Sequence, residues 1–207
     1  MMFSTLLMPI ALLLITITFT SVSEMTETIA NTKYTKCFCE ENIWHLCQHA
    51  DLEEFPKYVL FISNVIKQCP FWFQKTAPAQ EFICWDYHVV LAVNMEGWQI
   101  FDLDTTLSFP IDLKEYISST FKGKTGIHPG YFPNFKIIGA ERYVREFYSD
   151  RKHMKDEVGK WQSPAPDWPL ILGNKQLSID RLFDFTGSSK QEIYSLPEMV
   201  EYLYEEA

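Results

Sequence analysis

The sequence has too little positive charge for a nucleic-acid-binding protein. It contains 18 Lys and Arg residues against 27 Asp and Glu residues, a formal net charge of -9 at pH 7, and its pI is about 5.0. It has no dense stretch of Lys and Arg that would displace counterions from a phosphate backbone. Nucleic acid is therefore not an expected partner. An acidic surface favours cationic ligands, and a peptide with a free N-terminus is one of them.

Glycosylation signals are absent, and cysteine is scarce. No Asn-X-Ser/Thr acceptor occurs in the 207 residues, which agrees with a protein that does not meet the glycosylation machinery. The five cysteines are Cys37, Cys39, Cys47, Cys69 and Cys84. An odd number leaves at least one thiol free, and the density is too low for a small disulfide-stabilised fold. A reducing compartment is therefore expected.

The N-terminal segment has a long hydrophobic run but no positive charge before it. Residues 6–19 are nearly all apolar, small residues follow at 21–23, and the first basic residue is Lys33. A secretory signal carries a basic region ahead of its apolar core, so this segment is only partly signal-like. Met25 offers a second start, which would make the run a gene-model or isoform extension. We expect residues 1–33 to be an appended segment of one of these kinds, and residues 34–207 to form one domain.

Hydrophobic periodicity predicts both helices and strands. Apolar residues at three- and four-residue spacing predict helices, whereas runs of β-branched and aromatic residues predict strands. Helices are expected over residues 40–50, 113–121, 140–148 and 198–206, and strands over residues 58–63, 82–93, 98–103 and 135–138. Prolines and aromatic residues between positions 70 and 78 indicate an irregular connection. No internal repeat is present.

Cys39 is a candidate nucleophile, because it stands at or just before the start of the predicted helix 40–50. Unpaired backbone N–H groups and the positive end of the helix dipole stabilise a thiolate at that place. Glu40 and Glu41 follow at once, and their charges raise the pKa of a thiol unless they point away. They also suit the first turn of a helix. Most free cysteines are buried small hydrophobes, and position alone leaves that alternative open.

One histidine and two aspartates are expected to share one face of a β-hairpin. A three-residue loop over 95–97, with glycine at the left-handed position, pairs the two residues that flank the loop. In that register position 88 faces position 104. Because strand side chains alternate between faces, His88, Asp102 and Asp104 then lie on the same face. A shorter or longer loop would move both aspartates to the other face.

These residue types fit a template in which a histidine activates a nucleophile and a carboxylate orients the histidine. The spacing does not distinguish a protease from a transferase or an amidase, and His88 is equally explained as a hydrogen-bonded core residue. A non-enzymatic alternative is a zinc-stabilised interaction module, because zinc binds Cys and His side chains. The cluster that suggests it is Cys37, Cys39, His45, Cys47 and His49. Its spacing fits no standard zinc finger.

Three motifs resemble the signature blocks of the protein N-terminal glutamine amidohydrolase family. They are Cys37-Phe38-Cys39-Glu40-Glu41-Asn42-Ile43-Trp44, Trp85-Asp86-Tyr87-His88-Val89-Val90 and Asp102-Leu103-Asp104-Thr105. Further similar stretches are Phe61-Ile62-Ser63-Asn64, Ile127-His128-Pro129 and residues 149–156. The resemblance covers most of the chain from Tyr34 onward, and only the N-terminal extension departs from it.

The resemblance implies a catalytic triad and a fold. By motif, Cys39 matches the nucleophile, His88 the general base and acid, and Asp102 the residue that orients the histidine. The family is similar to transglutaminases, which implies an α+β papain/transglutaminase-like core, with an antiparallel sheet packed against the helix that bears the cysteine at its N-terminus. The implied reaction converts N-terminal glutamine to glutamate through a thioester and releases ammonia. A papain-like cysteine protease is the enzymatic alternative.

The resemblance also implies partners and a location. Substrates are proteins or peptides with a free N-terminal glutamine, and no cofactor or metal is needed. The expected protein is a monomer of the cytoplasm and nucleus that acts in the N-degron pathway without stable membrane association. Restriction to the chain terminus requires a site for the substrate ammonium, most simply a carboxylate. Glu41 and Asp86, together with Glu40, are candidates because they lie beside the catalytic motifs.

Overall fold

The structure is a computed structural model that describes residues 28–29, 32–78, 81–121, 127–174, 176–187 and 192–205. The apolar run at 6–19 and the alternative start at Met25 lie outside the described residues. Within the described ranges, no helix is both long and apolar enough to cross a membrane.

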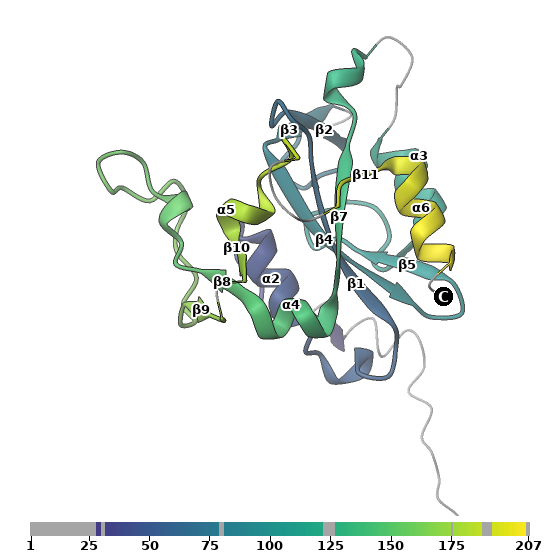
Figure 1. Ribbon diagram of the computed structural model, residues 1–207, viewed down its shortest axis with the longest axis horizontal. Helices are drawn as coiled ribbons and strands as arrows, with labels where there is room; N and C mark the ends of the chain where they lie inside the picture. The colour runs from purple at the N-terminus through teal and green to yellow at the C-terminus, as the bar shows by residue number, and fades with distance from the viewer. Residues whose placement is uncertain are drawn as a thin grey trace, which may run out of the picture.

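A six-stranded antiparallel sheet forms the centre of the molecule (Figure 1). Its strand order is β11-β7-β1-β4-β5-β6, and every neighbouring pair is antiparallel. The strands are β1 (Lys57–Ser63), β4 (Tyr87–Asn94), β5 (Trp98–Phe101), β6 (Ile111–Asp112), β7 (Asn134–Gly139) and β11 (Tyr194–Ser195). The described chain is therefore a mixed α+β fold built on an antiparallel sheet.

Helices cover both faces of this sheet. On one face lie α2 (Cys39–Leu46), α4 (Ala140–Glu146) and α5 (Ile179–Leu182), and on the other lie α3 (Leu113–Thr120) and α6 (Leu196–Glu205) (Figure 1). Val89 and Leu91 of β4 pack in one core with Ile43 of α2. Val90 and Ala92 belong to the opposite core. Because both faces of β4 are covered, the strand is a continuous apolar run instead of an alternating one.

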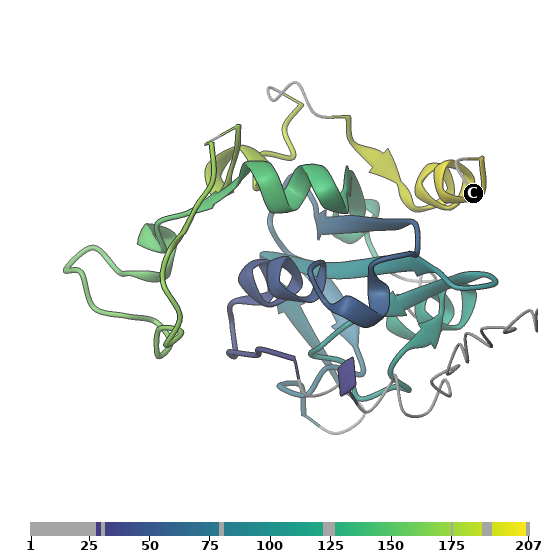
Figure 2. The same cartoon turned by 90° about the horizontal axis from the view of Figure 1, so that it is seen from below.

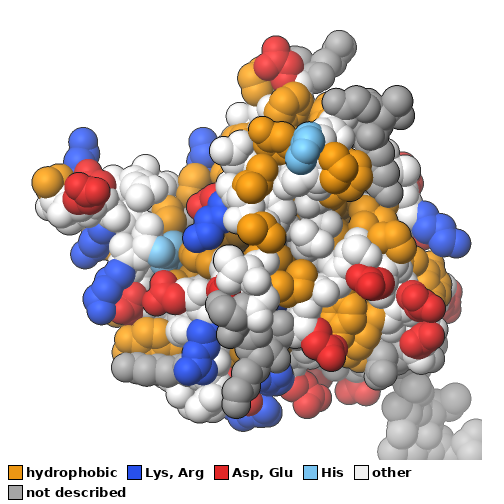
Figure 3. Space-filling view, turned by 45° about the horizontal axis from the view of Figure 1, so that its top comes forward, with side chains coloured by type: hydrophobic (Ala, Val, Ile, Leu, Met, Phe, Trp, Pro, Cys, Tyr) orange, Lys and Arg blue, Asp and Glu red, His pale blue; other side chains and the backbone are white. Residues whose placement is uncertain are grey.

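Two smaller sheets complete the fold. One pairs β2 (Cys69–Trp72) with β3 (Phe82–Trp85), and the other has the order β10-β8-β9, formed by β8 (Phe147–Ser149), β9 (Ile171–Leu172) and β10 (Leu177–Ser178). Short 3-10 turns are η1 (Ala50–Leu52), η2 (Pro129–Tyr131) and η3 (Lys152–Met154). The chain between β8 and β9 extends from the body as an arm (Figure 2). On the face shown in Figure 3, Lys and Arg side chains are scattered among carboxylates.

Several sequence predictions are confirmed. The helix expected over 113–121 is α3, and Asp112 caps it, since its Oδ1 accepts the backbone N–H groups of residues 114 and 115 at 2.9 and 3.1 Å. The hairpin has the predicted register, with Asn94 paired to Trp98. The strand pairing ends at Leu91 and Phe101, however, so the residues beyond 101 form a turn instead of continuing the ladder.

Other predictions are corrected. The strand expected over 82–93 is broken at Asp86 into β3 and β4, which pair with different partners. Asp86 Oδ1 accepts the N–H of Tyr87 at 2.9 Å, a local bond that competes with a strand ladder, and Ser63 Oγ donates to the carbonyl oxygen of Asp86. Part of the connection expected at 70–78 is strand β2, which tolerates Pro70 because it pairs on one side only.

The helix expected over 40–50 ends at Leu46. Gln48 N–H donates to the carbonyl of His45 at 3.1 Å and His49 N–H to that of Leu46 at 3.0 Å. Such short-range bonds tighten and close a last helical turn. The helix expected over 140–148 likewise stops at residue 146, where the chain enters β8.

Candidate active site

The first candidate residue, Cys39, is the first residue of α2. Cys37 has a left-handed backbone, with φ of 66°, and this turns the chain into the helix. Asn42 holds the preceding loop, because its Oδ1 accepts the N–H of Thr35 at 2.8 Å and its Nδ2 donates to the carbonyl of Thr35 at 2.9 Å. The prediction that Cys39 begins a helix is confirmed, and only 7% of the residue is exposed.

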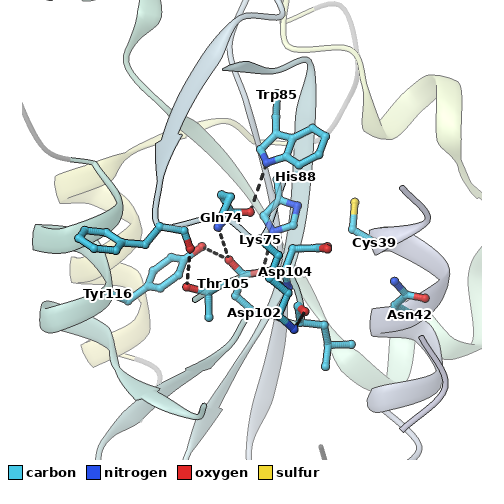
Figure 4. Close-up of polar contacts among 12 residues, drawn as sticks. Cys39, Asn42, Gln74, Lys75, Trp85, His88, Asp102, Asp104, Thr105 and Tyr116 are labelled. Carbon is cyan, nitrogen blue, oxygen red and sulfur yellow. Dashed lines mark hydrogen bonds and ion pairs between the residues drawn. The ribbon is translucent and has the colours of Figure 1, made fainter. Parts of the chain in front are cut away.

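His88 and Asp102 form a buried pair. His88 Nε2 lies 2.8 Å from Asp102 Oδ1. Asp102 also accepts hydrogen bonds from Gln74 Nε2 at 3.0 Å and Tyr116 OH at 2.9 Å, both on Oδ2, and from the N–H of Asp104 at 2.9 Å on Oδ1 (Figure 4). Both carboxylate oxygens are therefore occupied by donors. This network fixes Asp102, and Asp102 in turn fixes the ring of His88.

Two aromatic rings also hold the imidazole of His88. Trp85 stacks on it at a centroid distance of 5.9 Å and an angle of 14°, and Phe71 meets it edge-on at 5.3 Å and 83°. Trp85 is itself positioned, because its Nε1 donates to Gln74 Oε1 at 3.3 Å. The amide of Gln74 therefore links the indole of Trp85, which stacks on His88, to the carboxylate of Asp102.

Burial and charge act in opposite directions on this pair. Burial lowers the pKa of His88, but the charge and hydrogen bond of Asp102, with smaller effects of Asp104 and Glu40, raise this pKa above its usual value overall. Burial raises the pKa of Asp102, but the charge and hydrogen bond of His88, with the Gln74 and backbone donors, lower it overall. Asp102 is therefore the charged partner, and it favours a protonated imidazole.

Cys39 and His88 line one pocket of about 370 Å³. The residues around it are Cys37, Cys39, Trp85, Asp86, Tyr87, His88, Asp104, His153, Met154, Gln162, Ser163 and Phe183. The pocket thus combines the thiols of two cysteines, the imidazoles of two histidines and the two carboxylates of Asp86 and Asp104. Asp102 lies behind His88 and does not line the pocket.

The thiol of Cys39 contacts a carboxylate. Its Sγ donates to Glu40 Oε2 at 3.6 Å. Burial raises the pKa of the Cys39 thiol well above its usual value, the charges of Glu40 and Asp104 raise it further, and the backbone N–H of Val89 opposes them. The resting thiol is therefore protonated at neutral pH, and a base must remove its proton before it reacts.

Glu40 is fully buried beside the candidate nucleophile, Cys39. Its Oε2 also accepts a hydrogen bond from Tyr87 OH at 3.0 Å. Its Oε1 lies 3.3 Å from Nε2 of His153, near enough for an ion pair, but neither atom has an aligned hydrogen-bond partner among the described residues. Glu40 thus places an incompletely satisfied carboxylate between Cys39 and the pocket-lining His153.

Glu41 has a full set of partners. Arg151 binds it through two bonds, Nε to Oε1 at 2.9 Å and Nη2 to Oε2 at 2.7 Å, and Trp168 Nε1 donates to Oε2 at 2.7 Å. This pair joins α2 to the segment that follows β8. Because the charge of Glu41 is matched by Arg151, and because Glu41 does not line the pocket, its contacts are those of an anchor for the helix.

The geometry also bears on metal binding. The described residues contain one group of three His, Cys, Asp or Glu side chains whose ligand atoms converge, namely His88, Asp102 and Asp104, with these atoms within 4.8 Å of one another. Because both oxygens of Asp102 already accept hydrogen bonds, the group is a hydrogen-bonded network. The cysteines and histidines considered for zinc do not converge among the described residues, so the structure does not support the zinc-module alternative. All five cysteines are free thiols.

Sequence reasoning missed three residues that hold the site. Gln74 lies in the stretch predicted to be irregular, so no pattern marked it. Tyr116 is on the buried face of α3, where an aromatic residue is most simply explained as core. Arg151 has a left-handed backbone, with φ of 58°, and nothing in its sequence context indicates a buried partner. Only its place in stretch 149–156, which resembles the family, would have singled it out.

A cysteine at a helix start that shares a pocket with a carboxylate-bound histidine is the arrangement of cysteine-dependent hydrolases and acyltransferases. The family described as N-terminal glutamine amidase matches residues 34–203 of this chain. The chain therefore belongs to the N-terminal glutamine amidase family.

Individual relatives agree with this assignment. A protein N-terminal glutamine amidohydrolase from Bos taurus is 40% identical over 178 residues, which cover 81% of this chain and 84% of the relative. The protein of the same name from Homo sapiens is 41% identical over 154 residues, 71% of this chain and 75% of the relative. That from Danio rerio is 38% identical over 182 residues, 82% and 88% of the two chains.

Proposed function

We propose that this protein is an amidohydrolase that converts N-terminal glutamine of proteins and peptides to glutamate and releases ammonia. The observation that carries the proposal is that Cys39 and His88 line one pocket, with His88 held by Asp102 at 2.8 Å. Membership of the family and the names of its relatives support the same reaction.

In the proposed mechanism, His88 acts first as a base. Its Nε2 is engaged by Asp102, so Nδ1 is the nitrogen that takes the proton of the Cys39 thiol. The thiolate attacks the side-chain amide carbon of the substrate. The backbone N–H of Cys39, at the start of α2, stabilises the negative charge that develops on the amide oxygen.

The second half of the reaction releases both products. His88 gives its proton to the amide nitrogen, the C–N bond breaks, and ammonia leaves while the glutamyl group stays on Cys39 as a thioester. His88 then takes a proton from water, the hydroxide adds to the thioester carbon, and the C–S bond breaks. N-terminal glutamate and the free thiol result, and Asp102 keeps the imidazole oriented throughout.

The fold supports a finer classification. A helix that begins at the nucleophile packs against the antiparallel strand that carries the histidine, through Cys39 and Ile43 on α2 and Val89 on β4. We propose that this core is of the papain/transglutaminase type.

The proposal extends to oligomeric state and location. All three triad residues come from one chain, so a monomer is sufficient for the reaction. Five free thiols suit a protein of the cytoplasm and nucleus that acts in the N-degron pathway.

Terminal specificity needs a carboxylate for the substrate ammonium. Of the residues expected to supply it, Glu41 is already matched by Arg151. Asp86 is exposed and lines the pocket, so it offers a carboxylate at the mouth. Asp86 is thus the one of these two expected residues that remains a candidate, beside the proposed triad of Cys39, His88 and Asp102.

Ammonia release from two synthetic peptides tests the function. One peptide begins with glutamine and the other with the same glutamine acetylated, and each is incubated with the wild-type chain and with Cys39→Ala. Wild type should act only on the free peptide, and Cys39→Ala should lower the rate at least about 10⁴-fold.

Three other outcomes would each contradict the proposed function. Equal release from both peptides would indicate a general glutaminase. Cleavage of the peptide backbone, also in the acetylated peptide, would establish the papain-like protease instead. No release of ammonia by folded wild-type protein would refute the proposed function.

A further inference from the structure

The pocket holds a buried carboxylate that the triad does not use. Only 4% of Asp104 is exposed, and its side chain points from the turn after β5 toward α2, where Cys39 lies (Figure 4). Tyr34 OH donates to Asp104 Oδ1 at 2.5 Å. The nearby Lys75 donates instead to the carbonyl oxygen of Leu103 at 2.7 Å, and no Lys, Arg or His of the described chain forms an ion pair with Asp104.

The imidazole of His88 lies nearby, with its ligand nitrogen within 4.8 Å of an Asp104 oxygen, but His88 is paired with Asp102. A desolvated carboxylate without a bonded cation is unfavourable, so a ligand that supplies a positive charge stabilises this position. We propose that Asp104 binds the α-ammonium of the N-terminal glutamine, a role that rests on the function proposed above. The α-ammonium and the reacting side-chain amide belong to the same glutamine residue, and Asp104 and Cys39 line the same pocket. Both groups of the substrate therefore fit the site at once.

The other pocket carboxylate is less suited to this role. Asp86 is exposed, and its Oδ1 is engaged by the backbone N–H of Tyr87 at 2.9 Å. An ion pair is stronger where both charges are shielded from water, which favours Asp104 over Asp86. Tyr34 adds to the preference, because a phenol that donates to Oδ1 fixes the carboxylate and leaves Oδ2 for the ligand.

Holding the ammonium has a second consequence for the chemistry. In the thioester intermediate, a neutral α-amine could attack the thioester carbon of its own residue, forming a C–N bond and a five-membered lactam while the C–S bond breaks and the thiolate takes the amine's proton. This intramolecular route has a high effective concentration. An ammonium has no lone pair, and a neighbouring carboxylate favours that charged form. Asp104 thereby directs the intermediate toward hydrolysis and away from pyroglutamyl peptide.

Asp104→Asn tests both consequences, because it removes the charge and keeps an oxygen to accept the Tyr34 hydrogen bond. The measurement is the ratio of kcat/KM for a Gln-starting peptide to that for a glutaramoyl peptide, which has the same amide chain but no amine. Any change that the substitution causes in the reactivity of Cys39 or His88 affects both substrates and cancels in this ratio. The ratio should fall by about tenfold to a hundredfold in Asp104→Asn and by less in Asp86→Asn.

Products of the Gln-starting peptide are separated by mass, since glutamyl and pyroglutamyl peptides differ by one water. Asp104→Asn should yield pyroglutamyl peptide above the level formed by the double variant Cys39→Ala/Asp104→Asn, which makes no thioester. Unfolding midpoints confirm that the variants fold. An unchanged ratio in folded Asp104→Asn, or a larger loss in Asp86→Asn, would overturn the assignment of Asp104. A reduced ratio without pyroglutamyl product would keep the binding role and overturn the protective one. Inactive wild-type protein would instead refute the function itself.

Discussion

The two sides of the pocket differ in how completely their polar groups are satisfied. On the strand side, both oxygens of Asp102 accept hydrogen bonds, and the ring of His88 lies between Trp85 and Phe71. On the helix side, the thiol of Cys39 donates to Glu40 at 3.6 Å, and Glu40 Oε1 lacks an aligned donor among the described residues.

This difference separates the roles of base and nucleophile. The proposed base, His88, is held in one orientation before substrate arrives, so the proposed mechanism needs little reorganisation at the moment of reaction. The proposed nucleophile, Cys39, is kept protonated by burial and by three carboxylates, which limits its reaction with other electrophiles. In the proposed mechanism the thiol leaves Glu40 when His88 takes its proton. Changes on either side should therefore have distinguishable effects.

The largest effect is expected from Asp102→Asn, which removes the carboxylate that pairs with His88 on the strand side. The asparagine preserves the shape but no longer selects the proton arrangement of His88, so kcat should fall by about 10³- to 10⁴-fold. The residual activity should also change its pH dependence. Burial lowers the pKa of His88 and Asp102 raises it above the usual value, so removing the carboxylate lowers this pKa. Ammonia release by both proteins across the pH range measures the two effects.

The direction of the pH shift follows from which form is active. His88 must be neutral to accept the thiol proton, so activity rises with pH through the pKa of His88. In the wild type this rise should be centred above about pH 6.5, the usual value for histidine, and in Asp102→Asn it should move to lower pH. Tyr116→Phe is the matched control, because it removes one donor to Asp102 and keeps the carboxylate. A rise that moves upward in Asp102→Asn would contradict the assigned role.

The next largest effect is expected on the stability of the fold, when the Arg151–Glu41 ion pair that anchors α2 is broken. Arg151→Met leaves the buried carboxylate of Glu41 without its cation, which should lower the free energy of unfolding by about 3–5 kcal/mol. Chemical denaturation measures it. Arg145→Met is the control, since Arg145 pairs with Glu146 at the surface and should contribute less than about 1 kcal/mol. Equal losses in the two variants would show that the buried pair does not anchor α2.

The sequence predicted the strand side of this comparison better than the helix side. A three-residue loop with glycine sets the register of β4 and β5, and this register correctly predicted that His88 lies on the side of the two aspartates. The hydrogen bond of His88 is to Asp102 and not to the directly facing position 104, because the ladder ends at Phe101 and the chain turns. Such a turn depends on contacts with distant residues, which periodicity does not record.

The helix side was harder to predict for a physical reason. The start of α2 is a local feature, and the acidic residues of its first turn and its apolar spacing mark it. The partners of Glu40 and Glu41 are distant in sequence: Tyr87, His153, Arg151 and Trp168. Adjacent glutamates on a helix point in different directions, so Glu40 contacts Cys39 whereas Glu41 contacts Arg151. A single sequence shows two acidic residues and cannot assign these two environments.

The smallest effect is expected from Glu40→Gln, which tests whether the charge of Glu40 keeps the Cys39 thiol protonated. Burial is the largest cause of the raised pKa of Cys39, and Glu40 is the next. Removing that charge should lower the pKa and raise the thiolate fraction at neutral pH, so alkylation of Cys39 by iodoacetamide should become about tenfold faster. A glutamine oxygen still accepts the hydrogen bond of Tyr87, which preserves the local structure.

Two controls make this measurement specific to the nucleophile. Cys37 also lines the pocket and Cys84 is exposed, so the rates are compared in a Cys37→Ser/Cys84→Ser background. Asp86→Asn serves as the matched carboxylate variant, because Asp86 has the weakest of the effects on the Cys39 pKa and should change the alkylation rate much less. If Glu40→Gln left the rate unchanged or lowered it, Glu40 would not restrain the thiol. The helix side would then differ from the strand side only in its hydrogen bonding, and not in the electrostatic control of the nucleophile.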